Sequence, residues 1–244
     1  MQLLTNENDP KTIKGLKNGV RTAVQYWASA DKSGFDVCAF STSCAKNCID
    51  DTGRGGFDQK VKDARKTRTL IFFNERLEYE QKLYREVAMH EFVAKLDGFT
   101  PAVRLNGTSD IPWEKVKFKT QNSKTIFELF PQLTWYDYTK YPYSKRPNEK
   151  LPSNYHLTFS VSEETTDAEI HENIANGRNC AVVFDTKKGQ PLPETYLGIK
   201  VVDGDLDDLR FNDPKGVIVG LRVKSSKNEK KNQIIESGFV RKGD

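Results

Sequence analysis

Three of the four cysteines in this chain, Cys38, Cys44 and Cys48, lie within eleven consecutive residues. Thiols this close in sequence can converge on one point, where a soft metal ion or an iron–sulfur cluster is the usual occupant. The C-x5-C-x3-C spacing lacks the paired C-x2-C units of a zinc ribbon, and three ligands leave one coordination position open for chemistry. Ordinary reduced thiols, or a disulfide with one leftover thiol, are the alternatives, although four cysteines in 244 residues do not form a disulfide framework. The pattern favours a metal ion or a cluster.

Polar side chains also recur at alternate positions of segments that have the pattern of parallel strands. Buried parallel strands are normally near-continuous apolar runs, and a polar stripe inside a dry core would be costly. The stripes therefore predict a solvated cavity that holds a polar ligand, with edge strands that have one wet face as the alternative. The polar positions are Arg104 and Asn106 on one strand, Asp137 and Thr139 on the next, and His156, Thr158 and Ser160 on a third.

Residues 104–110, Arg-Leu-Asn-Gly-Thr-Ser-Asp, place a glycine among polar residues at the end of a predicted strand. Gly107 would let the backbone approach a ligand closely, and the Asp110 carboxylate can accept hydrogen bonds from hydroxyl or amino groups. The alternative is a helix N-cap formed by Ser109 or Asp110 ahead of Pro112.

Residues 203–213 pack five acidic residues around Arg210. The segment superficially resembles a calcium loop, but it lacks the glycine and the terminal glutamate at the required spacing. Three interpretations stay open: a magnesium or calcium site, a solvated acidic loop held by Arg210, and ligand binding by Asp203, Asp205 or Asp208.

The elements that must position these residues follow from the hydrophobic pattern. Strands that alternate with helices indicate an α/β fold with a mostly parallel sheet and outer helices. Six principal strands are too few for an eight-fold barrel, so a partial barrel or a strongly curved open sheet is expected. Strands are expected at 20–28 (or a short helix there), 101–106, 133–139, 155–161, 180–184 and 217–223, with a short one at 200–202, and helices at 57–69, 75–96, 123–130 and 166–177.

This order of elements brings the chemistry to one place. The cysteine loop and residues 106–110 each follow a parallel strand, and parallel α/β sheets bind ligands at the carboxyl ends of their strands. The cysteines and the polar stripes would therefore meet at one mouth.

The composition indicates a single folded domain over residues 1–244, with 30% charged and 11% aromatic residues. The net charge of +4 is too mild to identify a nucleic-acid binder. Segment 224–244, with Lys224, Lys227, Lys230 and Lys231, is expected to be a flexible, solvated stretch; phosphate contact is the less frequent role of such a run. No apolar run is long enough to span a bilayer, and no signal peptide is evident, so a cytoplasmic location is expected. Phosphate-loop, G-x-S-x-G and H-E-x-x-H motifs are absent.

The chain resembles a phage-encoded family of unassigned activity, the "gene product eighty-eight" type domain. The similarity covers nearly the whole chain, from about Thr12 to Val240. It is carried by the cysteine loop with Gly53-Arg54-Gly55, and by the strings at 101–113 (Pro-Ala-Val-Arg-Leu-Asn-Gly-Thr-Ser-Asp-Ile-Pro-Trp), 136–142, 154–160 and 203–211.

The order of strand, three-cysteine loop, helix and further strand units is also similar to the partial (β/α)6 barrel of radical S-adenosylmethionine enzymes. This resemblance implies a [4Fe–4S] cluster on Cys38, Cys44 and Cys48, with S-adenosylmethionine on the fourth iron. The spacing here differs from the C-x3-C-x2-C pattern of those enzymes. The residues that the resemblance places near cofactor or substrate are Arg104, Asn106, Asp110 and the face formed by His156, Thr158 and Ser160.

The leading hypothesis is therefore an iron–sulfur protein with radical-type S-adenosylmethionine chemistry on a small-molecule substrate. The alternative is a non-catalytic protein whose cluster or zinc fixes the loop, and which binds nucleic acid or a partner protein. In that case Cys180 could close the site as a fourth ligand, although a buried, inert thiol is the commoner fate of a cysteine at the start of a strand. A metal-dependent hydrolase or nuclease that uses the acids of 203–213, with Asp205 among them, is a third possibility.

Overall fold

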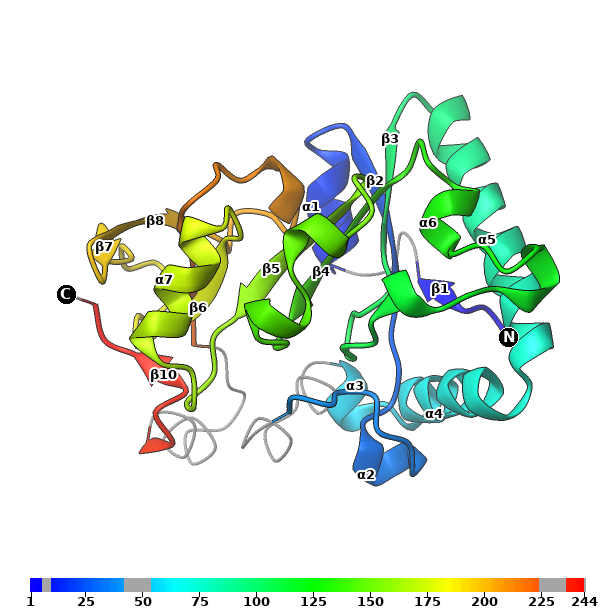
Figure 1. Ribbon diagram of the computed structural model, residues 1–244, viewed down its shortest axis with the longest axis horizontal. Coiled ribbons are helices and arrows are strands. Elements are labelled where there is room, and N and C mark those ends of the chain that lie inside the picture. The colour runs from blue at the N-terminus through cyan, green and yellow to red at the C-terminus, as the bar shows by residue number, and fades with distance from the viewer. Residues whose placement is uncertain (6–9, 42–53, 224–235, 244) are drawn as a thin grey trace.

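The computed structural model of the chain describes residues 1–5, 10–41, 54–223 and 236–243. Within these residues ten strands form one sheet in the order β1-β2-β3-β4-β5-β6-β9-β8-β7, with β10 also paired to β6 (Figure 1). The strands β2 to β6, β8, β9 and β10 run parallel, and β1 and β7 are antiparallel at the two edges. The strands are β1 (Leu4–Thr5), β2 (Val20–Gln25), β3 (Thr100–Arg104), β4 (Thr134–Thr139), β5 (Tyr155–Ser160), β6 (Cys180–Phe184), β7 (Thr195–Tyr196), β8 (Ile199–Asp203), β9 (Ile218–Arg222) and β10 (Val240–Arg241).

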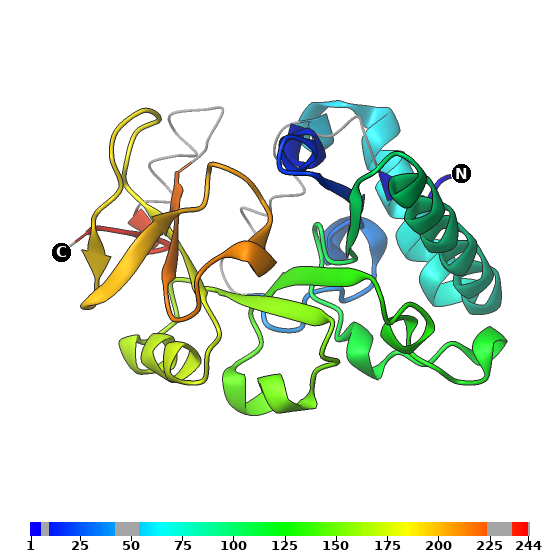
Figure 2. The same cartoon turned by 90° about the horizontal axis from the view of Figure 1, so that it is seen from above.

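The helices alternate with these strands and lie mainly on one side of the sheet (Figure 2). They are α1 (Pro10–Leu16), α2 (Ala30–Ser33), α3 (Arg54–Phe57), α4 (Gln59–Asn74), α5 (Arg76–Leu96), α6 (Ile126–Leu129) and α7 (Asp167–Ala175), with 3-10 turns η3 (Trp113–Lys115), η4 (Lys119–Gln121), η5 (Tyr143–Lys145), η6 (Asn148–Lys150) and η7 (Arg210–Asn212). None of the helices in this part of the chain combines the length and the apolar character that crossing a bilayer requires. The predicted α/β fold with a mostly parallel sheet is confirmed.

Local sequence explains where α4 and α7 begin. The Asp58 carboxylate accepts hydrogen bonds from the backbone N–H groups of Lys60 and Val61 and so caps α4. Thr166 and Glu169 form a reciprocal capping box at the start of α7.

The sheet is open and strongly curved, and β5 and β6 are paired over only part of their length. β5 pairs with only the first residues of β6, through Phe159 with Cys180 and Ser160 with Ala181. Beyond that point β10 takes the place of β5 beside β6. Segment 224–244, expected to be flexible, therefore contributes a strand at Val240–Arg241; residues 224–235 and 244 lie outside the described part.

The main core lies between the convex face of β2–β5 and the helices α4 to α6. Its centre is an aromatic cluster in which Trp27 contacts Phe72, with ring centroids 4.5 Å apart, and Trp113, 5.7 Å apart. Tyr79 completes the cluster and donates a hydrogen bond from its hydroxyl to Gln25 of β2. A second core lies between α7 and strands β5, β6 and β9.

The buried face of α5 does not include all of its large apolar side chains. Leu83 and Val87 are fully buried, but Leu77 and Phe92 are 54% and 64% exposed. The buried residues on this helix are Tyr79, Glu80, Leu83, Val87, His90 and Ala94. Hydrophobicity alone does not distinguish the two faces of α5, because the buried face includes polar side chains that have specific partners. One of them is His90, whose Nε2 lies 3.1 Å from the Ala102 carbonyl oxygen.

The concave face of the sheet is filled by the connection between β8 and β9, residues 204–217, which we call the crossover segment. Its turn η7 lies on the side of the sheet opposite to most helices (Figure 2). Leu209 packs there with Val20, Ala102 and Tyr136, and the Phe211 ring lies 5.1 Å from that of Tyr136. The middle of the concave face is therefore packed with side chains.

Candidate functional site at the carboxyl edge

The beginning of the cysteine loop is fixed at the carboxyl edge of the sheet. The Asp36 carboxylate accepts a hydrogen bond from the Cys38 backbone N–H at 2.9 Å, and the Val37 carbonyl accepts one from the Asp110 N–H at 2.8 Å. Cys38 is half-buried and packs against the main core. The described start of the loop therefore lies beside the segment that follows β3.

The other two proposed ligands, Cys44 and Cys48, lie outside the described residues. Within the described residues there is no group of three or more histidine, cysteine, aspartate or glutamate side chains that could hold a metal ion.

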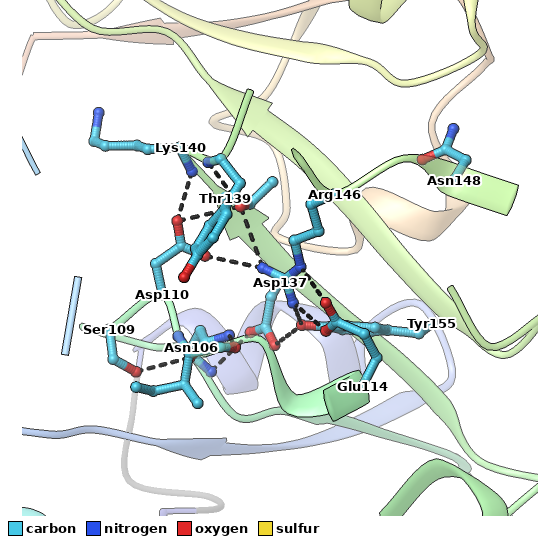
Figure 3. Close-up of polar contacts among 12 residues, drawn as sticks. Asn106, Ser109, Asp110, Glu114, Asp137, Thr139, Lys140, Arg146, Asn148 and Tyr155 are labelled. Atoms are coloured by element: carbon cyan, nitrogen blue, oxygen red, sulfur yellow. Dashed lines mark hydrogen bonds and ion pairs between the residues drawn. The ribbon is translucent and has the colours of Figure 1, made fainter. Parts of the chain in front are cut away.

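Next to Cys38, the Asp110 side chain lies at one end of a buried polar network (Figure 3). One carboxylate oxygen pairs with Nη1 of Arg146 at 3.0 Å, and the other accepts from the Lys140 N–H at 2.7 Å and the Thr139 hydroxyl at 3.2 Å. Arg146 also donates from Nε and Nη2 to Glu114, at 2.9 and 2.7 Å. The bidentate pair fixes the guanidinium in place.

The network continues under β4 and β5 to the end of β3. Nη2 of Arg146 donates to the Tyr155 hydroxyl at 3.2 Å, which donates to Asp137 at 3.0 Å. The second Asp137 oxygen accepts from the Asn106 N–H at 2.9 Å. Burial raises the pKa of the Asp137 carboxyl to about 6, although Arg104 and these hydrogen bonds act in the opposite direction. Burial likewise raises the pKa of Asp110 against the effect of Arg146.

Asn106 and Gly107 shape the loop that carries Asp110. The Asn106 side-chain oxygen accepts from the Ser109 hydroxyl at 2.8 Å and the Ile111 N–H at 2.9 Å. A Cβ at Gly107 would lie 2.5 Å from the Gln25 carbonyl oxygen and 2.7 Å from the Tyr26 ring, so the close approach is to β2. The following turn η3 has no side-chain cap, so neither Ser109 nor Asp110 serves as one.

The polar stripes lie on two different faces. In the parallel register Arg104, His156, Thr158 and Ser160 face the concave side, whereas Asp137 and Thr139 alternate with Tyr136 and Tyr138 and face the helices. Arg104 is buried; it pairs with Asp208 of the crossover segment and stacks on Tyr136 and Tyr138, with ring centroids 5.5 and 5.2 Å from the guanidinium carbon.

The polar residues of β5 are spread along the strand. His156, near its amino end, is exposed with its ring 6.2 Å from that of Phe211, and partial burial and Lys215 lower its pKa. Thr158 is buried, and Ser160 is half-buried at the carboxyl end. Of the three, Ser160 is placed nearest that edge, where its carbonyl accepts from Lys140 Nζ at 3.5 Å.

The acids of 203–213 are each matched with an arginine. The pairs are Asp203 and Asp205 with Arg222, Asp207 and Asp213 with Arg210, and Asp208 with Arg104. Arg210 thus does hold part of the loop, as one interpretation expected, and the other acids are held by arginines from β3 and β9.

Cys180, the fourth cysteine, is the first residue of β6 and is fully buried. Its thiol contacts the Ile170 carbonyl oxygen at 3.8 Å, and burial raises its pKa to about 12.

Arg146, Glu114 and Tyr155 were not identified from the sequence. Glu114 lies in η3, Arg146 directly follows η5, and Tyr155 is the first residue of β5, so no periodicity marks a buried face there. The available signal was an arginine between Pro142 and Pro147 in a stretch rich in tyrosine.

Comparison with protein families gives one match: the family model described as Gene product 88 matches residues 2–243. Neither the curated proteins nor the solved structures contain a match to the chain.

Proposed function

This chain belongs to the Gene product 88 family of bacteriophage proteins, and we propose that it acts as an iron–sulfur protein with radical-type S-adenosylmethionine chemistry. In this proposal Cys38, Cys44 and Cys48 hold a [4Fe–4S] cluster that has one open iron. Three thiols within eleven residues form a donor set that suits such a cluster.

The observation that carries the proposal is the position of Cys38. It is half-buried at the carboxyl edge of a parallel sheet, with the Val37 carbonyl bonded to the Asp110 N–H. Ligands of α/β proteins bind at this edge, because the loops there are held by the rigid strands beneath them.

The position of Cys180 favours a three-cysteine cluster with one open iron over a zinc site that is closed by four cysteines. It is fully buried and lies four strands away from β2 in the sheet order. A site without Cys180 has three protein thiolates and one free position, which is the arrangement of catalytic metal sites.

When bound, such a cluster supplies a position for S-adenosylmethionine and one electron for breaking a carbon–sulfur bond of its sulfonium. The roles of the described residues are to bind and orient. Asp110 and Asn106 hold the loop 106–111 in shape beside Cys38, and Arg146 holds Asp110. Because these side chains already have partners, we assign them positioning roles, whereas the half-buried Ser160 stays available for contact with a ligand.

The partial (β/α)6-like barrel is the finer part of the proposal. The curvature of the parallel sheet supports the partial barrel. Side-chain contacts between the region of α1 and the crossover segment support it as well. Lys14 of α1 donates to the Asp205 carbonyl at 2.5 Å, and Asn18 donates to Asp207 at 3.0 Å. Because the crossover segment fills the concave face, the proposed reaction site lies at the carboxyl rim, above that packing.

The proposal is tested by the electronic spectrum of anaerobically reconstituted protein, recorded with and without S-adenosylmethionine. Broad visible absorption that shifts when the nucleotide is added is the expected result. Absorption that is unchanged by saturating nucleotide would refute the S-adenosylmethionine chemistry and leave a structural cluster.

A further inference from the structure

The most exposed large apolar side chain in the described part of the chain is Phe57, at 77%. It ends α3 and lies directly before Asp58, the N-cap of α4. An aromatic ring held at a helix start and open to solvent offers a flat face on which another ring can stack.

Helix α4 adds an excess of positive charge beside this ring. It carries five basic residues and a single acid, Asp63, whose carboxylate accepts from the Gln59 side chain at 2.8 Å. The basic residues are Lys60, Lys62, Arg65, Lys66 and Arg68.

The two arginines and the three lysines of α4 differ in their surroundings. Arg65 is buried with its guanidinium carbon 5.2 Å from the centre of the Tyr26 ring, and Arg68 donates to the Gln2 carbonyl at 2.8 Å. Lys60, Lys62 and Lys66 form no ion pair with any residue that the structure describes. Their charges remain available to an external anion.

We propose that Phe57 and the lysines of α4 form a binding surface for single-stranded nucleic acid. Proteins bind single strands by stacking bases on aromatic side chains while cations follow the phosphates, and base stacking needs a strand whose bases are not already paired. A duplex would offer phosphates but no free base face. This inference does not depend on the proposed cluster.

The test is fluorescence anisotropy of a labelled 20-nucleotide oligothymidine with the full-length protein, titrated at several salt concentrations. Wild-type protein should bind, and Phe57→Ala should weaken binding about tenfold, which corresponds to ~1.4 kcal/mol and lies within the range for one stacked base. The double variant Lys60→Glu/Lys66→Glu should lower the slope of log K against log salt by about 1.4, since each phosphate contact on a single strand contributes about 0.7.

The matched control is Lys187→Glu/Lys188→Glu, two exposed lysines in the turn after β6 that change the net charge equally. This variant should bind like wild type. The inference would be overturned if wild-type protein did not bind, or if the two double variants lost equal affinity. It would also be overturned if a duplex of the same length bound as tightly as the single strand. Iron-free protein and Cys44→Ala should bind normally, so loss of the cluster would be distinguished from loss of this surface.

Discussion

At the residue scale, the polar side chains near Cys38 are held chiefly by one another. Arg146 joins Asp110, Glu114 and Tyr155 in the core, and the fork of its guanidinium matches the Glu114 carboxylate. Removing one partner from such a buried pair leaves an uncompensated charge, which is strongly destabilising. The network is therefore suited to fixing the shape of the loops at the carboxyl edge.

Asp137 is expected to make stability depend on pH. Its folded-state pKa of about 6 exceeds the value of about 3.9 in an unfolded chain, so the folded state binds the proton more tightly. The resulting stabilisation is fully present below about pH 4 and is lost as pH rises through 6, by up to about 3 kcal/mol. Urea denaturation of wild type and Asp137→Asn from pH 4 to pH 8 should show the wild-type advantage shrinking as pH rises.

Asp203 is the matched control for this measurement. Hydrogen bonding with Arg222 lowers its pKa, so its contribution is lost in the opposite direction, as pH falls below the usual range for aspartate. A difference between wild type and Asp137→Asn that stays constant from pH 4 to pH 8 would show that Asp137 has no raised pKa.

At the scale of elements, the crossover segment between β8 and β9 reaches across the concave face to strands β2, β3 and β4. It leaves β8, passes Leu209 and Phe211 over the concave face, and joins β3 through the pair of Asp208 with Arg104. The Gly204 position has no room for a side chain, since a Cβ there would lie 2.5 Å from Val219. The segment therefore has one tightly packed path.

A double-mutant cycle should show that the Arg104–Asp208 pair couples β3 to this segment. Arg104→Met and Asp208→Asn, alone and together, should give an interaction free energy of about 2 kcal/mol in chemical denaturation, because the Arg104 side chain is only 3% exposed. The pair of Arg21 with Asp97, 2.5 Å apart and with side chains 14% and 46% exposed, should give less than about 1 kcal/mol, because water screens it more. Equal coupling in the two pairs would show that burial does not strengthen the first.

The two faces of α5 give a second prediction for an element. Leu83→Ala should lower the free energy of unfolding by about 2–5 kcal/mol, since it opens a cavity in the main core. Phe92→Ala, on the exposed face, should change it by less than about 0.5 kcal/mol. Thermal and urea unfolding of both variants would check this, and a larger loss for Phe92 would reverse the assignment of the faces.

The elements were more predictable from the sequence than the site. The strand Cys180–Phe184 is a continuous apolar run, and the helix Gln59–Asn74 has its own N-cap in Asp58, so the positions of both follow from local signals. The partners of Arg104 and Asp110 come from residues 104 and 36 positions further along the chain. Contacts this distant depend on how the sheet curves, which no local pattern contains.

At the scale of the whole molecule, the carboxyl edge of the sheet brings together the root of the cysteine loop and the buried network. The convex face is covered by helices and the concave face by the crossover segment, as Figure 2 shows. The rim is therefore where a reaction site can lie. The proposed nucleic-acid surface on α4 begins at Phe57, just after the segment that carries Cys44 and Cys48.

The most direct test is iron and acid-labile sulfide analysis after anaerobic reconstitution of wild type, Cys44→Ala and Cys180→Ala. Wild type and Cys180→Ala should each contain one [4Fe–4S] cluster per chain, and Cys44→Ala should lose it, because the proposed site uses the loop cysteines alone as ligands. A colourless, iron-free wild-type protein, or bound zinc that is lost on substitution of Cys180, would contradict the proposed three-cysteine cluster.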